Sequence, residues 1–124
     1  MDEETGFMEL EFVKWLRAQL QPHPRLNLGL GDDAASLAVT SGRELVVTTD
    51  LLTDGVDFVL GECDPFRVGR KALAVNLSDL AAMAAEPIAA LVSVALPAEG
   101  AAPLARTIYA GILELSRRHD VALA

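Results

Sequence analysis

The sequence predicts an α/β (α+β) fold, with a mixed, mainly antiparallel sheet and helices packed on one of its faces. Segments with helical periodicity alternate along the chain with short runs of strand character. Two of those runs are joined by Ser41-Gly42-Arg43, which is typical of a hairpin turn. The chain has 124 residues, of which 52% are hydrophobic and 23% charged. It is therefore long enough for one compact domain over residues 1–124 and too short for two.

Periodicity and turn residues set the expected elements of the first half. A helix over residues 7–20 carries an apolar stripe, and the prolines that follow it stop the helix. Its inner face is predicted to consist of Leu10, Val13, Leu16 and Leu20. Three strand-like runs come next, at residues 35–40, 44–49 and 55–59.

The second half begins with a strong helix-start signal. Asp64 supplies a capping carboxylate and Pro65 suits the first helical position, so we expect a helix that continues to Glu86 before Pro87. The remaining elements are a buried strand over 88–96, an amphipathic helix over 102–118 and a strand-like run over 121–124. Because the chain stops inside that apolar run, we expect it to be the N-terminal part of a longer protein.

Composition excludes several classes of partner. The net charge of −8 leaves no basic surface for nucleic acid or an anionic membrane. No apolar run reaches the ~20 residues that span a bilayer. Cys63 is the single cysteine and only two histidines accompany it, so neither a disulfide nor a zinc site is expected. We expect a soluble, cytoplasmic protein.

The first candidate for chemistry is the stretch Gly29-Leu30-Gly31-Asp32-Asp33. Glycines allow close backbone approach to a ligand, and adjacent carboxylates suit a hard cation such as Mg²⁺. The same residue types also dominate ordinary solvated turns, so this motif has a purely structural interpretation as well.

The second candidate is Thr48-Thr49-Asp50, at the end of an expected strand. On a strand, Thr48 and Asp50 share one face, and Thr49 lies on the other. A carboxylate beside two hydroxyls at a strand end presents oxygen ligands to a metal. The alternative is that Asp50 begins a turn and the threonines favour β structure.

The third candidate is Asp79, on the helix predicted after Asp64. From residue 72 to residue 85 only Asn76, Ser78 and Asp79 are not apolar, which is typical of a buried helix. A buried carboxylate needs a metal, a cation or a hydrogen-bond network beside it. A structural interpretation is that Asp79 pairs with Lys71, with Arg70 or with the N-terminus of another helix. Because the chain has no P-loop ending in Gly-Lys-Ser/Thr, a nucleotide would be held through Mg²⁺ ions.

These motifs together resemble the thiamine-monophosphate kinase family. The resemblance lies in GDDAA at 31–35, TTD at 48–50, DGVDF at 54–58 and KALAVNLSDLAAM at 71–83. Their order and gaps match the family's N-terminal domain over nearly the whole chain. The family is related to aminoimidazole ribonucleotide synthetase, selenophosphate synthetase and the hydrogenase-maturation dehydratase. The resemblance therefore implies a fold like the N-terminal domain of aminoimidazole ribonucleotide synthetase.

The resemblance implies a function as well. It implies phosphorylation of thiamine monophosphate to thiamine diphosphate, with ATP and Mg²⁺, by direct phosphoryl transfer in a homodimer that pairs through its sheets. The positions that match the family's magnesium ligands are Asp33, Thr48, Thr49, Asp50 and Asp79, with Asp32 as a weaker addition. No covalent intermediate is needed, because catalysis of this kind depends on positioning and charge neutralisation.

Two departures from the family pattern affect this expectation. Asp57 stands where the family commonly has a substrate-contacting histidine, and an anionic side chain near a substrate phosphate should repel it. The family's next motif, Gly-Gly-Asp-Thr, and its C-terminal domain would follow Ala124. We therefore expect residues 1–124 to be inactive alone. The alternatives are a related ATP-dependent enzyme with another acceptor, or a non-catalytic dimerisation or metal-binding module.

Overall fold

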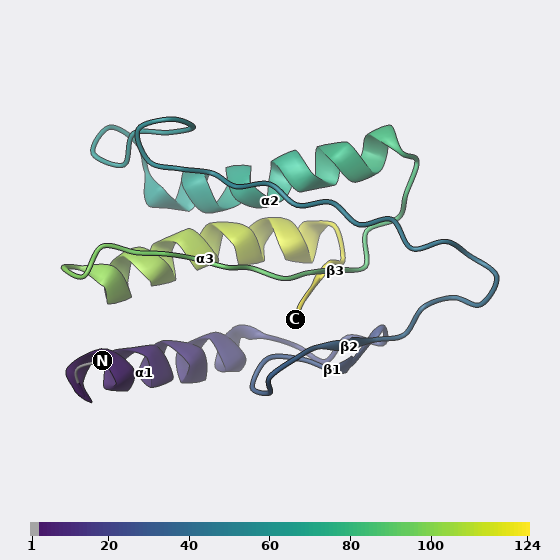
Figure 1. The fold of residues 1–124 in the computed structure, drawn as a ribbon, viewed down its shortest axis with the longest axis horizontal. Helices are drawn as coiled ribbons and strands as arrows, with labels where there is room; N and C mark the ends of the chain where they lie inside the picture. The colour runs from purple at the N-terminus through teal and green to yellow at the C-terminus, as the bar shows by residue number, and fades with distance from the viewer. Residues whose placement is uncertain (1–2) are drawn as a thin grey trace.

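The protein, analysed as a computed structural model, is described over residues 3–124 (Figure 1). The helices of this part of the chain are α1 (Glu3–Gln19), α2 (Pro65–Ala82) and α3 (Ala101–Arg118). Its strands are β1 (Leu26–Leu28), β2 (Ser36–Leu37), β3 (Ala89–Ala90) and β4 (Ala122–Leu123). Over the same residues no helix combines the length and the apolar character that crossing a membrane requires.

The strands form two separate pairs. β1 and β2 are antiparallel, with Leu26 opposite Leu37, whereas β3 and β4 are parallel, with Ala89 opposite Ala122. A parallel pair requires a crossover connection, and here α3 provides it. The α/β class is therefore confirmed, but the described residues form one antiparallel and one parallel pair and not one mainly antiparallel sheet.

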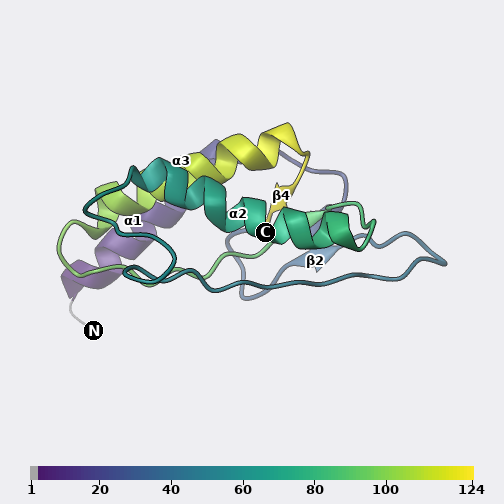
Figure 2. The ribbon, with the colours of Figure 1, turned by 90° about the horizontal axis from the view of Figure 1, so that it is seen from above.

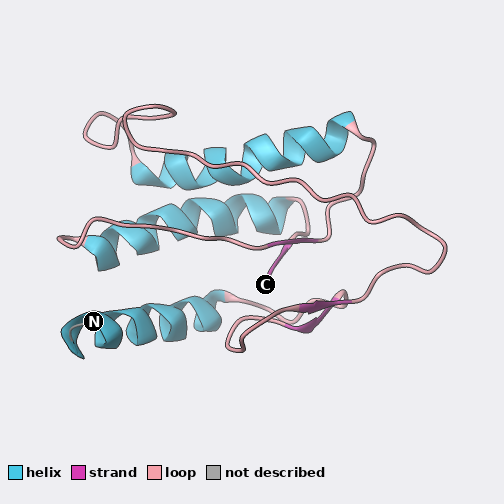
Figure 3. Ribbon diagram, in the orientation of Figure 1, coloured by secondary structure: helices cyan, strands magenta, loops and turns pink. Residues whose placement is uncertain are grey.

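The helices lie together on one side of the molecule. Figure 1 shows α3 between α2 and α1, and in Figure 2 the long extended segments run below the helices. Most of this extended chain is loop, as the pink trace in Figure 3 shows. The core is correspondingly formed where α1, α2 and α3 meet.

The helices α2 and α3 pack so closely that their backbones touch. A Cβ on Gly69 would lie 1.8 Å from the carbonyl oxygen of Ile108, and a Cβ on Gly111 would lie 1.9 Å from that of Phe66. Real Cβ atoms do not approach oxygen so closely. Each helix therefore uses a glycine to admit a carbonyl of the other helix, and this reciprocal contact fixes their spacing.

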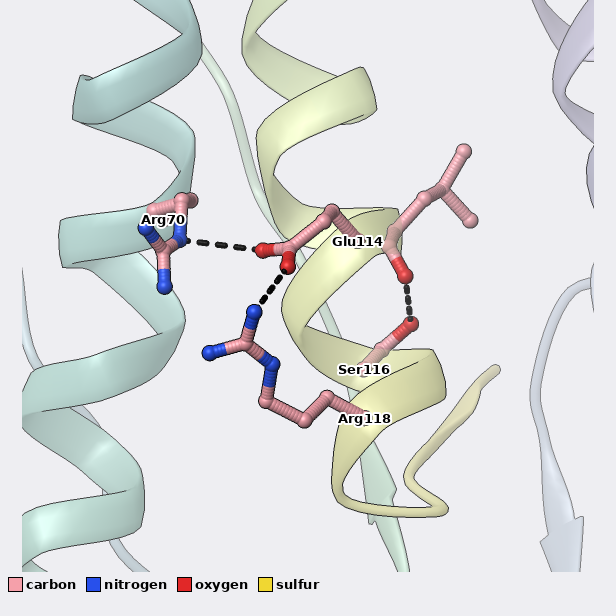
Figure 4. Close-up of polar contacts among 5 residues, drawn as sticks. Arg70, Glu114, Ser116 and Arg118 are labelled. Carbon is pink, nitrogen blue, oxygen red and sulfur yellow. Dashed lines mark hydrogen bonds and ion pairs between the residues drawn. The ribbon is translucent and has the colours of Figure 1, made fainter.

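A polar contact supports the same helix pair at its edge (Figure 4). Arg70 Nε of α2 lies 3.0 Å from Glu114 Oε2 of α3, and Arg118 Nη2 donates to Glu114 Oε1 at 2.8 Å. The Arg70 and Glu114 atoms are shielded from solvent and are not aligned as a hydrogen bond. The contact is therefore an ion pair in which the Glu114 carboxylate neutralises the charge of Arg70.

Aromatic packing attaches α1 to α3. The ring of Phe12 stacks on Trp15 and meets Tyr109 edge-on, with centroids 5.7 and 5.0 Å apart. Leu16 is buried, as predicted, but Leu10 is 63% exposed. Phe12 takes the inward position that the leucine pattern assigned to Leu10, because an aromatic ring reaches Tyr109 across the helix interface.

Burial of Tyr109 also affects its ionisation. Desolvation raises the pKa of the Tyr109 hydroxyl above its ordinary value. The side chain therefore stays neutral at any ordinary pH, and it packs in the core, with Trp15 against the same cluster.

Two further contacts join the end of α1 to the end of α3. Arg117 Nη2 donates to the carbonyl oxygen of Gln19 at 3.1 Å, which satisfies one of the free carbonyls at the end of α1. The His23 ring lies 3.2 Å from the carbonyl oxygen of Asp120 and accepts from the Arg25 amide. His23 is therefore a structural residue of this junction.

The ends of α2 show one confirmed and one wrong prediction. Asp64 accepts a hydrogen bond from the Phe66 amide at 2.9 Å, so the predicted N-cap is confirmed. The helix ends at Ala82, however, and not at Glu86. Ala84 adopts a φ of 52°, and the Ala85 amide donates back to the Leu80 carbonyl at 2.9 Å. This left-handed termination stops the helix before Pro87 can.

The predicted strands are mostly shorter than their sequence patterns. The turn at Ser41-Gly42 is present, with an Arg43 amide to Thr40 carbonyl hydrogen bond of 3.3 Å. No ladder follows it: β2 pairs with β1, and residues 44–49 and 55–59 are loop. Only Ala89–Ala90 of the run 88–96 is strand. Alternation predicts an extended chain but not its partner, and ladder hydrogen bonds define a strand.

The glycine contact predicts a large loss of stability from a small change. We expect Gly69→Ala or Gly111→Ala to lower the free energy of unfolding by about 1–3 kcal/mol, because the new methyl group meets a backbone carbonyl that cannot rotate away. Gly61→Ala is the matched control, since nothing lies within 4 Å of its added Cβ. Denaturant unfolding measures all three, and an unchanged stability in the helix variants would contradict the contact.

The termination of α2 predicts a gain in stability. We expect Ala84→Gly to raise the free energy of unfolding by about 0.5–1 kcal/mol, because glycine adopts a positive φ without the steric cost that alanine bears. Ala74→Gly, at an exposed interior position of the same helix, should instead lower it by about 1 kcal/mol. Thermal unfolding of both variants gives the signs, and equal losses would show that Ala84 is not left-handed.

Candidate functional site

Two of the predicted site residues meet on α2. The Thr48 hydroxyl donates a hydrogen bond to Asp79 Oδ2 at 3.2 Å. Thr48 belongs to the extended segment that follows the turn at Ser41-Gly42, and Asp79 lies in the last turn of α2. Residues that are 31 positions apart in the sequence thus form one oxygen-rich contact.

The predicted burial of Asp79 is wrong for this chain, since its side chain is exposed. The helix buries Val68, Gly69 and Leu73 against α3, while its alanine-rich end remains open. The proposed pairing of Asp79 with Arg70 or Lys71 does not form either. Arg70 pairs with Glu114, and Lys71 contacts the main-chain oxygen of Asp57. The described partner of Asp79 is Thr48 alone.

Thr49 and Asp50 follow directly in the same extended segment. Both are exposed, whereas Thr48 is half-buried by its contact with the helix. The segment therefore presents a hydroxyl and a carboxylate next to the Thr48–Asp79 contact, all free to meet a ligand from solvent.

Asp33 and Asp32 lie elsewhere, in the connection between β1 and β2. The Asp33 amide donates to Asp32 Oδ1 at 2.8 Å, so Asp32 organises its own turn, and both residues are exposed. In Figure 1 this connection is on the α1 side of α3, and α2 is on the opposite side. Among the side chains that the structure describes, those of residues 8–124, no three of His, Cys, Asp or Glu come together in one metal-holding group.

The chemistry of these donors nevertheless fits Mg²⁺. Carboxylate and hydroxyl oxygens are the hard ligands that this ion prefers, and it keeps several waters besides one or two carboxylates. Asp79 offers a carboxylate that is already bonded to the Thr48 hydroxyl, and Asp50 offers a second carboxylate two positions after Thr48 in the same segment. The chemical types of these donors therefore suit Mg²⁺. Asp33 is the predicted ligand that lies apart from the others, in the connection between β1 and β2.

Asp57, predicted to contact substrate, lies in a compact loop after this segment. Its Oδ2 accepts a hydrogen bond from the Thr53 amide at 2.7 Å, and its own amide donates to the Thr53 carbonyl at 2.9 Å. Lys71 of α2 donates to the Asp57 main-chain oxygen. The carboxylate is thus bonded within its own loop.

A cavity of about 680 Å³ lies between the C-terminal ends of α1 and α3. The glycine-rich stretch at 29–32 lines it, together with Arg17 and Arg117. The guanidinium of Arg17 lies against Gly31, whose φ of 119° and close neighbours leave no room for a side chain. This volume is in the range of small-molecule sites, but the cavity does not include Thr48, Asp50 or Asp79.

Sequence reasoning missed the two contacts that organise the site. The Thr48–Asp79 hydrogen bond and the Lys71–Asp57 contact both join α2 to a segment that precedes it. Residue types singled out Thr48, Asp57 and Asp79 individually. No spacing rule pairs a helix with an extended segment, so the pairing itself carried no sequence signal.

Comparison with known proteins gives consistent matches. The family described as "AIR synthase related protein, N-terminal domain" matches residues 31–124. The thiamine-monophosphate kinase of Rhodopirellula baltica is 44% identical over 124 residues, which cover 94% of this chain and 39% of that protein. The Bacillus subtilis thiamine-monophosphate kinase is 33% identical, covering 93% of this chain and 35% of its own length.

A solved structure agrees with these matches. The crystal structure of thiamine-monophosphate kinase from Stenotrophomonas maltophilia superposes with a TM-score of 0.76 at 41% identity, covering 89% of this chain and 34% of that chain. The chain thus spans little more than a third of the proteins it resembles. Fold and sequence together establish that the chain belongs to the AIR synthase related protein family, to whose N-terminal domain it corresponds.

Proposed function

We propose that residues 1–124 form the metal- and ATP-binding N-terminal domain of a kinase that phosphorylates thiamine monophosphate to thiamine diphosphate. The observation that carries this proposal is the Thr48–Asp79 contact, which brings together two of the four sequence blocks that resemble this family. The relatives that bear the name thiamine-monophosphate kinase support the choice of reaction. The proposed pathway is thiamine diphosphate biosynthesis.

The proposed metal ligands are the oxygens of the site. They are Asp33, Thr48, Thr49, Asp50 and Asp79. When bound, Mg²⁺ offsets the negative charge of the two phosphates that the reaction brings together. The chain's own task is then to hold these oxygens in place and to align donor and acceptor for direct transfer. The loop that contains Asp57 is the proposed substrate contact.

We propose that the domain works as a homodimer in the cytoplasm. The loop segments at 44–51 and 91–95 expose several large apolar side chains, with Val47 and Leu91 each 79% exposed and Leu51 87% exposed. Such surface normally finds a partner. Pairing of these segments between two copies would supply ladder hydrogen bonds and complete a larger, mainly antiparallel sheet with the helices outside it.

A related enzyme with a different phosphate acceptor is the second candidate. Asp57 favours it, because the resemblance places a histidine at this position and a carboxylate changes the charge offered to the substrate. A non-catalytic dimerisation or metal-binding module is the third. It predicts metal binding without any transfer of phosphate.

The proposal predicts loss of activity from neutral variants at the site. In the longest natural form of the chain, Asp50→Asn and Asp79→Asn should each lower kcat/KM for thiamine monophosphate at least about a hundredfold, because an amide oxygen neutralises no charge on the metal. Asp64→Asn is the matched control on the same helix, since asparagine caps equally well, and its activity should be unchanged. The rate of thiamine diphosphate formation is measured for all three variants.

Two outcomes would count against the proposal. Equal activity of Asp79→Asn and the Asp64→Asn control would remove Asp79 from the metal site. Absence of thiamine diphosphate, with Mg²⁺-dependent ATP binding intact, would favour the related enzyme with another acceptor. Assay with other phosphate acceptors then decides between that enzyme and the non-catalytic module.

A further inference from the structure

The loop at residues 53–60 is organised from within by two acidic side chains. Thr53 and Asp57 are joined twice: the Thr53 amide donates to Asp57 Oδ2, and the Asp57 amide donates to the Thr53 carbonyl. Asp54 Oδ1 accepts from the Leu60 amide at 2.8 Å, which closes the far end of the loop. The Gly55 amide donates to the Phe58 carbonyl at 2.7 Å between them. The loop is therefore a preformed unit.

Lys71 attaches this unit to α2. Its Nζ donates to the main-chain oxygen of Asp57, and among the described side chains of residues 8–124 no acidic group pairs with Lys71. A lysine side chain loses considerable rotamer freedom when it is held in one geometry, and the bond to the carbonyl offsets that loss. The contact places a positive charge directly beside the residue that replaces the family's histidine.

The loop and the metal-ligand segment share α2 as their support. Thr48 is fixed to Asp79, and Asp57 is fixed to Lys71. The two helix residues are eight positions apart, or roughly 12 Å along the axis. The segment between Thr48 and Asp57 therefore runs along α2 and is held near both ends. A shift at the Lys71 end would move the loop without moving the Thr48 end.

We propose that Asp57 and Lys71 act as positioning residues for the phosphate acceptor: Asp57 caps its own loop, and Lys71 holds that loop on α2. This inference rests on the proposed kinase function, since it makes the loop the acceptor contact. The Asp57 carboxylate is bonded to the Thr53 amide, and the Lys71 ammonium lies beside the same residue. The substitution of histidine by aspartate thus leaves the loop ordered and its charge balanced for an anionic acceptor.

Two pairs of variants separate this role from direct substrate contact. Lys71→Met removes the bond to Asp57, and Lys71→Arg keeps a donor. Asp57→Ala removes the cap, and Asp57→Asn keeps an oxygen that accepts from the Thr53 amide but removes the charge. Each is made in the longest natural form of the protein. Amide hydrogen exchange at Thr53 and Leu60 measures how well the loop is ordered, and steady-state kinetics give the KM and kcat for the phosphate acceptor.

We expect Lys71→Met and Asp57→Ala to speed exchange at the Thr53 amide about tenfold and to raise the KM for thiamine monophosphate about tenfold, with kcat within about twofold, the scale of one charge-assisted hydrogen bond. Lys71→Arg and Asp57→Asn should restore both readouts to near the parent values. This rescue distinguishes positioning from a general loss of stability, which would lower kcat for all variants alike.

Other outcomes would overturn the inference. If Asp57→Asn and Asp57→Ala raised the KM equally with exchange unchanged, the carboxylate would contact the substrate by its charge. If exchange at Thr53 were unaltered in Lys71→Met, Lys71 would not hold the loop. The exchange measurement needs no turnover, so it decides the positioning role even where the parent protein forms no thiamine diphosphate and the kinase proposal itself fails.

Discussion

The backbone contact between α2 and α3 is the constraint on which the rest of the fold depends. Gly69 and Gly111 each admit a carbonyl oxygen of the opposite helix, at a spacing that no side chain would allow. Among the described residues this pair is the largest helix interface, and α3 in turn forms the crossover between β3 and β4 and the aromatic contact with α1. The position of α2, and of the segments that contact it, therefore depends on the absence of a Cβ atom at these two glycines.

The proposed site lies on the face of α2 that this contact leaves free. Asp79 and Lys71 each hold one end of the segment between Thr48 and Asp57 through a single polar contact. A rigid helix is a suitable base for a site whose work is positioning and charge neutralisation, because those effects fail when ligands are displaced by even an ångström. Thr48, Asp79 and Lys71 are therefore all held on one support, α2.

The sequence predicted the helices well because each carries its own signals. Asp64 and Pro65 mark the start of α2, and the apolar stripe of α3 agrees closely with the observed Ala101–Arg118. The strands were overestimated, since Leu45 and Val47 show strand alternation but find no backbone partner within the described residues. The site residues were identified by chemical type and family resemblance. Their contacts depend on the α2–α3 spacing and on the path of the extended chain, which local periodicity does not encode.

The central claim is that a divalent cation is held where the Thr48 segment meets Asp79, and Mn²⁺ tests it most directly as a paramagnetic substitute for Mg²⁺. In NMR spectra of the protein with substoichiometric Mn²⁺, the amide signals of Thr49, Asp50 and Asp79 should broaden first and together. The signal of Gly61, in a turn outside the site, should persist. Broadening that spares Asp50 and Asp79, or that spreads evenly over the acidic surface, would contradict the account.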